Sequence, residues 1–304
     1  MKKSTKILIG LLVLLGIAYA IQRLTFSTST TENSNPFSNI DTSKVNQISI
    51  LSDGREIVIV RESRGWFLTN PLHFPANLTE VNLLLDAVAA NPSASVVADN
   101  LTDSVAYGLG AGAPTIKISE NIQKEVSLRV GNITPDFDGC YVEVNGNKKI
   151  LDLSKNIRTY AGEQVASWRD KRIFDFSLDE IQAADFALGD TLYHFFHRDT
   201  LWQVNGNNVP LAKIQDVVGN FVGTMAIDFV DTSLTEEKPL VDYGFSLSDG
   251  TRVAGKVTKS GDQTYASNSS LNQNYIIGST ISENLIRGLR EIGRDYLHKE
   301  TLKR

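Results

Sequence analysis

The sequence predicts an α+β protein: two tandem repeats of a mostly antiparallel sheet with packed helices, placed after an N-terminal membrane helix. Three observations lead to this prediction. A basic start precedes an unbroken apolar run, distinctive residues recur at a fixed offset of 136, and segments that alternate with period two are followed by segments with helical spacing. We expect the membrane helix in residues 1–26, a flexible tether in 27–39, and the two repeats in 40–168 and 169–304.

The apolar run covers residues 7–21 and follows three lysines, an order that keeps the basic end in the cytoplasm and sends the rest outward. A helix of this length spans roughly 22 Å, whereas a hydrocarbon core is about 30 Å thick. Two alternatives stay open. Residues 18–20 (Ala-Tyr-Ala) have the form of a cleavage site for a signal peptide, and residues 22–26 extend the run to the length of a retained anchor. We favour the anchor, with a single pass through a bacterial cell membrane and a periplasmic C-terminal part.

The internal repeat is the most informative feature of the sequence. Three pairs of segments are related by the offset of 136: Trp66 and Trp202, Tyr107-Gly108-Leu109 and Tyr243-Gly244-Phe245, and residues 45–48 and 181–184. Each Trp follows an apolar segment typical of a strand, and each precedes a loop that contains proline. We interpret Trp66, Trp202, Tyr107 and Tyr243 as structural signatures of the repeat.

A helix is predicted after each of these loops. Its apolar positions follow the spacing i, i+3, i+4, i+7 in both copies: Val81, Leu84, Leu85 and Val88 in the first, and Ile214, Val217, Val218 and Phe221 in the second. The offset between these two sets is 133, so a surface loop of the first copy is three residues longer.

The first copy then alternates through residues 115–119, 126–130 and 141–144, which predicts half-buried strands. Asp53-Gly54, Asn145-Gly146 and Asp249-Gly250 are typical of hairpin turns. We expect each copy to end in a second helix, over residues 154–165 and 282–300, with Ser282 as the N-cap of the last one.

Composition and charge exclude several classes of function. The formal net charge is -5, and no long Lys/Arg block follows the N-terminus, which speaks against binding of DNA or RNA. The only cysteine, Cys140, cannot form an internal disulfide, and we interpret it as a small buried apolar side chain.

The sequence provides no catalytic, cofactor-binding or metal site. His194 and His197 are three residues apart, so on a strand they point to opposite faces and cannot share a metal ion. His73 has no evident catalytic partner. The glycines at 108, 110 and 112 lack the dinucleotide-binding spacing, and residues 136–139 lack most ligands of a calcium loop, so both segments are interpreted as turns.

One cluster, Trp168-Arg169-Asp170-Lys171-Arg172, lies at the junction between the copies. An exposed Trp beside cations is the composition of a docking surface or of a contact between domains. We therefore expect Trp168, Arg169, Lys171 and Arg172 either to hold the two copies together or to bind a partner.

The order of short motifs resembles the domain-of-unknown-function family 4340. These motifs are Gly65-Trp66 to Pro71, Tyr107-Gly108-Leu109, Val130-Gly131, Tyr141-Val142, and Arg169-Asp170-Lys171 leading to Ile173-Phe174. The second copy departs from the pattern, because Leu201 precedes Trp202 and Phe245 follows Gly244. The resemblance implies an envelope protein encoded beside ABC-transporter components of the gliding-motility type, with no catalytic residues to carry over.

These observations predict a non-catalytic, membrane-anchored accessory or scaffold protein that acts through protein contacts, with an ABC-type transporter complex as the expected partner. The alternative is a module that binds an envelope glycan or a small ligand in a cleft between the repeats, near Trp168. An envelope hydrolase is the third alternative, because a site can assemble from residues that are far apart in the sequence.

Overall fold

The computed structural model describes residues 35–198, 201–230 and 239–297, which form two compact units. Unit 1 contains the described residues up to His73 together with Leu78–Gln164. Unit 2 contains Phe74–Asn77 together with the described residues from Val165 onward. The predicted membrane helix and most of the predicted tether lie outside the described residues. Among the helices that are described, none has the length and apolar character needed to cross a membrane.

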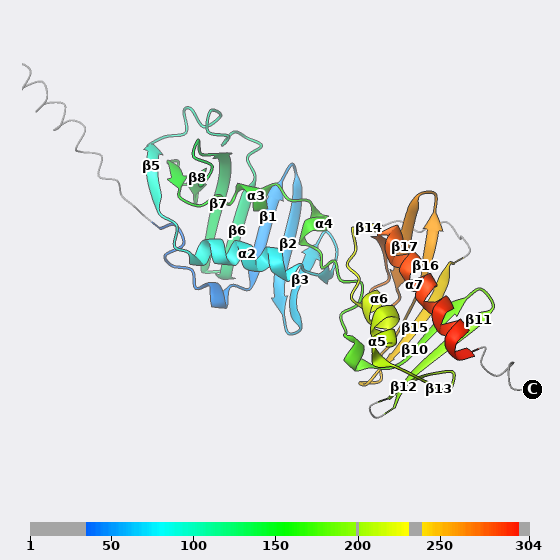
Figure 1. Cartoon of the computed structure of the whole chain (residues 1–304). Helices are drawn as coiled ribbons and strands as arrows, with labels where there is room; N and C mark the ends of the chain where they lie inside the picture. The colour runs from blue at the N-terminus through cyan, green and yellow to red at the C-terminus, as the bar shows by residue number, and fades with distance from the viewer. Residues whose placement is uncertain (1–34, 199–200, 231–238, 298–304) are drawn as a thin grey trace, which may run out of the picture. The chain divides into compact units, whose positions relative to one another are not determined.

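Unit 1 is built on a sheet with the strand order β4-β3-β2-β1-β6-β7-β8-β9-β5, in which the first strand, the two-residue β4, belongs to the segment Phe74–Asn77 of unit 2 (Figure 1). The strands are β1 (Gln47–Ser52), β2 (Arg55–Glu62), β3 (Gly65–Asn70), β4 (Phe74–Pro75), β5 (Ala94–Ala98), β6 (Thr115–Asn121), β7 (Lys124–Ile133), β8 (Cys140–Val144) and β9 (Ile150–Leu153). From β3 to β5 in this order, all neighbouring strands pair antiparallel.

Unit 2 repeats this sheet with the order β13-β12-β11-β10-β15-β16-β17-β18-β14. The strands are β10 (Ile181–Leu188), β11 (Thr191–Arg198), β12 (Leu201–Val204), β13 (Asn207–Val209), β14 (Asp228–Val230), β15 (Val241–Leu247), β16 (Arg252–Ser260), β17 (Gln263–Asn268) and β18 (Gln273–Ile277). All neighbours pair antiparallel. Because strand order and pairing direction agree, the two units are tandem repeats of one α+β fold, as the sequence predicted.

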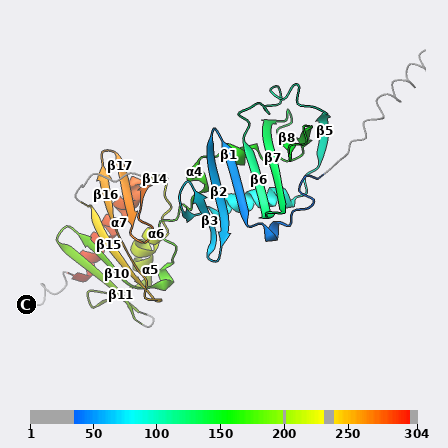
Figure 2. The ribbon, with the colours of Figure 1, turned by 180° about the vertical axis from the view of Figure 1, so that it is seen from behind.

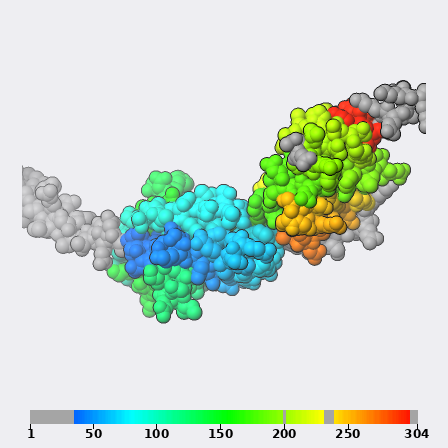
Figure 3. Space-filling model, turned by 90° about the horizontal axis from the view of Figure 1, so that it is seen from below, coloured from blue at the N-terminus to red at the C-terminus, as the bar shows by residue number. Residues whose placement is uncertain are grey.

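The main helices lie against one face of each sheet (Figures 1 and 2). In unit 1 this is α2 (Leu78–Ala89), and in unit 2 it is the helical segment of α5 (Leu211–Ile214), η3 (Gln215–Gly219) and α6 (Asn220–Val222) together with α7 (Ser279–Ile292). The short helices are η1 (Thr42–Lys44), α3 (Arg158–Ala161), α4 (Val165–Trp168), η2 (Leu178–Glu180) and η4 (Gly293–Leu297). At the start of unit 1, Asn35 Nδ2 donates a 2.9 Å hydrogen bond to Asn91 Oδ1, just beyond α2. In the space-filling view of Figure 3, the first described residues of unit 1, in blue, lie beside the cyan residues that include α2.

Two predicted helices are wrong in their bounds. The helix expected over residues 154–165 is only the single turn α3, which ends at the C-cap Gly162, followed by α4. The last long helix begins three residues earlier than expected, after the N-cap Gly278. Ser282 is therefore not a cap: it lies inside the first turn, is buried, and donates its hydroxyl hydrogen bond to the carbonyl of Ser279.

The covered face of each sheet forms the core of its unit. In unit 1 the core is mainly aliphatic and includes Ile48, Ile50, Ile57, Ile59, Ile116 and Ile118, with Val81, Leu84, Leu85 and Val88 from α2. In unit 2 it is aromatic, and Phe174, Phe176, Phe186, Phe221, Tyr243 and Phe245 lie in mutual ring contacts of 5.0–6.5 Å. Edge-to-face contacts of this kind add specific attraction to the burial of large rings.

The structure corrects the predicted equivalence of the two Tyr-Gly pairs. Ile48 of β1 pairs with Ile118 of β6, and Ala184 of β10 pairs with Phe245 of β15, so Phe245 corresponds to Ile118 and not to Leu109. Tyr243 lies on a core strand, whereas Tyr107 lies in the loop before β6. The segment between β5 and β6 is longer than the segment between β14 and β15, so the strands that follow it are no longer related by the offset of 136.

The predicted hairpin turns are present. Asp53 and Gly54, between β1 and β2, have φ values of 50° and 72°. Asn145 and Gly146, between β8 and β9, have φ values of 49° and 66°, so both pairs have the positive φ that these turns require. Gly250 has a φ of 88° in the turn between β15 and β16. Cys140 is fully buried on β8, as expected for a structural thiol.

Candidate functional site

The junction cluster divides into a buried half and an exposed half. The expectation of an exposed tryptophan is wrong, because Trp168 is fully buried and Arg169 is only 2% exposed. Lys171 is half-buried and Arg172 is exposed. A surface formed by all four side chains therefore does not exist in the structure.

Arg169 is a structural element of unit 2. Its guanidinium carbon lies 4.4 Å from the ring centre of Phe74 and 3.8 Å from that of Phe229, so the cation is held between two aromatic faces. Its Nη2 atom donates a 2.6 Å hydrogen bond to Oε1 of the Gln273 side chain. These contacts tie β14, β18 and Phe74–Asn77 together inside unit 2.

The backbone of the cluster forms bridges on both sides. Ala76 and Met225 form antiparallel bridges with Arg169 and Arg172, respectively, and the amide of Ala226 donates to the carbonyl of Lys171 at 2.7 Å. The sequence reveals an unusual composition here but cannot reveal burial, because Arg and Trp are enriched both in interfaces and in paired core positions.

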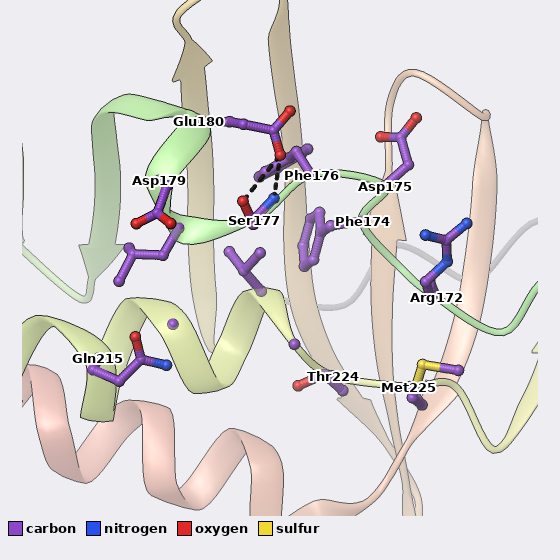
Figure 4. A pocket seen from close by; sticks show the side chains of 14 residues that line it. Arg172, Phe174, Asp175, Phe176, Ser177, Asp179, Glu180, Gln215, Thr224 and Met225 are labelled. Atoms are coloured by element: carbon purple, nitrogen blue, oxygen red, sulfur yellow. Dashed lines mark hydrogen bonds between the residues drawn. The ribbon is translucent and has the colours of Figure 1, made fainter.

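Arg172 marks the start of a pocket of about 530 Å³ in unit 2 (Figure 4). One wall is the segment of residues 172–180, and the other is formed by the helical segment and the turn that follows it. The lining residues are Arg172, Phe174, Asp175, Phe176, Ser177, Leu178, Asp179, Glu180, Gln215, Gly219, Val222, Gly223, Thr224 and Met225. The pocket is an aromatic and polar hollow inside one repeat, and no local pattern in the sequence predicts it.

The electrostatics of this pocket are mainly acidic. Asp175, Asp179 and Glu180 carry exposed carboxylates. Glu180 Oε2 accepts hydrogen bonds from the Ser177 amide at 2.7 Å and from its hydroxyl at 3.0 Å, which fixes this side chain on η2. Arg172 is bound by the Asp170 carboxylate at 2.6 Å, and this contact raises the pKa of the guanidinium.

The two signature tryptophans occupy equivalent positions and are buried. Trp66 is paired with Arg61 of the neighbouring strand, whose guanidinium lies 5.1 Å from the indole centre. Trp202 is paired in the same way with His197, whose ring stacks on the indole at 4.7 Å and 8°. In both units the indole face is thus covered by a cross-strand polar side chain, which leaves it unavailable to a ligand.

The histidines in the described part of the chain, His73, His194 and His197, do not form a metal site. His194 and His197 lie on opposite faces of β11, as predicted, and His194 Nδ1 lies 2.6 Å from Asp185. His73 Nε2 lies 2.9 Å from Glu62 Oε1, a partner that the sequence did not suggest. Across the described residues, no three His, Cys, Asp or Glu side chains are grouped so that they could hold a metal ion.

The sheet face of unit 2 opposite the helices carries apolar side chains that the sequence analysis missed. Leu192 and Phe196 of β11 are 57% and 41% exposed, and Leu201 of β12 is 54% exposed. Leu192 and Phe196 alternate with the core residues Tyr193 and Phe195, so period two predicts their outward direction. We call this surface, with the outward residues of β10, β15 and β16, the open face of unit 2.

Comparison with known proteins gives one finding. A family model described as Domain of unknown function (DUF4340) matches residues 66–246. Neither the curated proteins nor the solved structures gave a match. The matched range runs from β3 of unit 1 into β15 of unit 2 and contains the Tyr107-Gly108-Leu109 and Arg169-Asp170-Lys171 motifs. Because the match covers more than half of the sequence, the chain belongs to the DUF4340 family.

Proposed function

We propose that this protein is a membrane-anchored, extracytoplasmic accessory or scaffold protein that acts through protein contacts. Its partner in this proposal is a membrane protein such as an ABC-type transporter complex, and its anchor is the apolar run of residues 7–21. The proposal involves no catalytic step and no cofactor.

The open face of unit 2 carries this proposal. Leu192 and Phe196 of β11 and Leu201 of β12 are large exposed apolar side chains on one face, with His194 between the first two, and no helix covers this face in Figure 2. A group of exposed apolar side chains among polar ones is typical of protein interfaces. The equivalent positions of Leu192 and Phe196 in unit 1 are Glu56 and Val60, so unit 1 has a carboxylate in place of Leu192 and a smaller side chain in place of Phe196.

The test is a crosslinking pull-down of the full-length protein from native membranes. We expect a specific membrane protein to be recovered with the wild type and lost with the double variant Leu192→Ser/Phe196→Ser. The matched control is Leu51→Ser, which removes an apolar side chain of similar exposure (48%) from unit 1. Recovery of the same proteins with both variants, at unchanged thermal stability, would contradict the proposal.

The pocket of unit 2 favours a second candidate function, the binding of a small ligand or glycan fragment. Its volume of about 530 Å³ and its mixture of aromatic and polar lining groups are typical of a small-molecule site. Saturation-transfer NMR with N-acetylglucosamine oligomers tests this function, with Gln215→Leu as the pocket variant and Gln263→Leu, on β17, as the control. Equal transfer to all three proteins would exclude binding of these oligomers in the pocket.

A further inference from the structure

The open face of unit 2 has an apolar side and a cationic side. The strands β11, β10, β15 and β16 are consecutive neighbours, so their outward residues form four parallel rows. The β11 row contains Leu192, His194 and Phe196, and the β16 row contains Arg252, Ala254 and Lys256, all exposed. A partner that lies between the two rows meets apolar side chains on one side and two cations on the other.

The two middle rows carry mainly short side chains. Ala187, Asp185 and Ala183 on β10 lie opposite Asp242, Gly244 and Ser246 on β15. A Cβ atom added at Gly244 would meet no other atom within 4 Å, so the space above the centre of this face is open. Beside Lys256 the surface is hollowed by a further 340 Å³ or so, lined by hydroxyl and amide groups that include Ser267 and Asn274.

The dimensions of this face fit a helix. Neighbouring strands are about 4.8 Å apart, so β11 and β16 are separated by roughly 14 Å, whereas an α-helix with its side chains is about 10 Å wide. A helix also satisfies its own backbone hydrogen bonds, which the face of a sheet cannot do for an extended peptide, since the backbone groups of the sheet are already paired.

We propose that the open face of unit 2 binds an amphipathic α-helix of a partner protein, with apolar side chains toward Leu192 and Phe196 and carboxylates toward Arg252 and Lys256. We infer carboxylates on the partner helix from the positive charges of Arg252 and Lys256. Within the described residues neither Arg252 nor Lys256 takes part in an ion pair, whereas Asp185 is already bound to His194 at 2.6 Å. Asp242 lies opposite Lys256 in the strand register, whereas the residue opposite Arg252 is the uncharged Ser246. Arg252 is therefore the stronger contact for a carboxylate of the partner.

Unit 1 provides an internal comparison. Three of the six residues that correspond to the two middle rows are longer there, namely Gln47, Leu51 and Lys117. Lys117 also lies 3.9 Å from Glu125, so its charge is partly neutralised. The same sheet therefore offers no such surface in unit 1, and the helix is specific to unit 2.

This inference rests on the proposed function and is tested separately from it, with two synthetic helical peptides and the full-length protein in detergent. Both peptides carry the same Leu/Ala face. One has Glu and the other Lys along one flank, and fluorescence anisotropy measures their affinities. We expect the Glu peptide to bind at least ten times more tightly than the Lys peptide. Arg252→Glu/Lys256→Glu should reverse this preference, and Phe196→Ser should weaken both peptides.

The control variant is Lys117→Glu in unit 1, which should leave both affinities unchanged. All substituted side chains are exposed, and an unchanged melting temperature shows that folding is intact. Equal affinity for both peptides, or a preference that survives the charge reversal, overturns the inference. If the peptide test fails but the membrane pull-down still recovers a partner, the helix-binding inference is wrong and the proposed function stands. If the peptides bind selectively but the pull-down recovers no partner, the open face binds helices and the proposed membrane partner is wrong.

Discussion

The two sheets have the same strand order but differ on the face opposite their helices. In unit 1 the loop that contains Tyr107 packs over this face: the Tyr107 ring meets Tyr141 at 4.8 Å, and Arg129 donates to the carbonyl of Leu109 at 2.7 Å. In unit 2 the strands β11, β10, β15 and β16 leave it open. The inner face must fit a core and is constrained to apolar residues, so the outer face is where two copies of one fold can acquire different functions.

The largest expected effect comes from the buried half of the junction cluster. Arg169→Ala removes a cation held between two rings and leaves Gln273 with one fewer partner, so we expect unit 2 to lose about 3 kcal/mol of unfolding free energy. Urea unfolding monitored by tryptophan fluorescence measures this, because the neighbouring Trp168 is buried.

The exposed half of the cluster provides the control for this prediction. Arg172→Ala removes a pair that is half exposed, and it should cost between 0 and about 1 kcal/mol. Equal losses for the two variants would mean that the cluster acts as one surface, which would contradict the division into a buried and an exposed half.

The next largest effects concern the two glycines that contact the signature tyrosines, Gly131 beside Tyr107 and Gly255 beside Tyr243. A Cβ at Gly131 would overlap the carbonyl of Tyr107, and one at Gly255 would overlap the carbonyl of Ser267 and the ring of Tyr243. We expect Gly131→Ala and Gly255→Ala each to destabilise the unit that contains it by about 1–3 kcal/mol. Hydrogen exchange read by mass spectrometry assigns the loss to one unit, and Gly244→Ala, which meets no atom, should leave both units unchanged.

The inner faces could be predicted from the sequence because burial leaves a periodic signal. Val81 to Val88 and Ile214 to Phe221 repeat one helical spacing, and an apolar strand precedes each Trp. The structure confirms these elements. The predicted equivalence of Tyr107-Gly108 and Tyr243-Gly244 was wrong because a shared dipeptide does not determine strand register. The register is set by the pairing of strands that are distant in the sequence.

The surfaces could be predicted much less well. The cluster at 168–172 attracted attention through its composition, but its burial depends on Phe74 and Phe229, which are far from it in the sequence and meet it only in the fold. The pocket likewise combines residues 172–180 with the helical segment. Neither assembly leaves a local pattern, so only the three-dimensional structure reveals it.

A smaller effect is expected when the side chain that covers either signature tryptophan is removed. Arg61→Ala removes a cation from the face of Trp66, and His197→Ala removes a stacked ring from Trp202. Each should cost about 0.5–1 kcal/mol and expose one indole. Acrylamide quenching of fluorescence should rise in both variants; an unchanged quenching rate would show that the cross-strand side chain does not shield the indole.

The smallest effect is a pH dependence confined to unit 1. Burial, and then the charge of Asp136, raises the pKa of Asp152 above its ordinary value of 3.8. The unfolded state therefore releases the proton of Asp152 at lower pH than the folded state does, and ionisation costs stability as pH rises through the folded-state pKa. Asp152→Asn lacks this cost, so its melting temperature should exceed that of the wild type by a degree or two at pH 7, and the difference should vanish below pH 3.8. If the difference in melting temperature stays constant across this pH range, the gain comes from packing. The titration of the Asp152 carboxyl group then makes no contribution to the stability of unit 1.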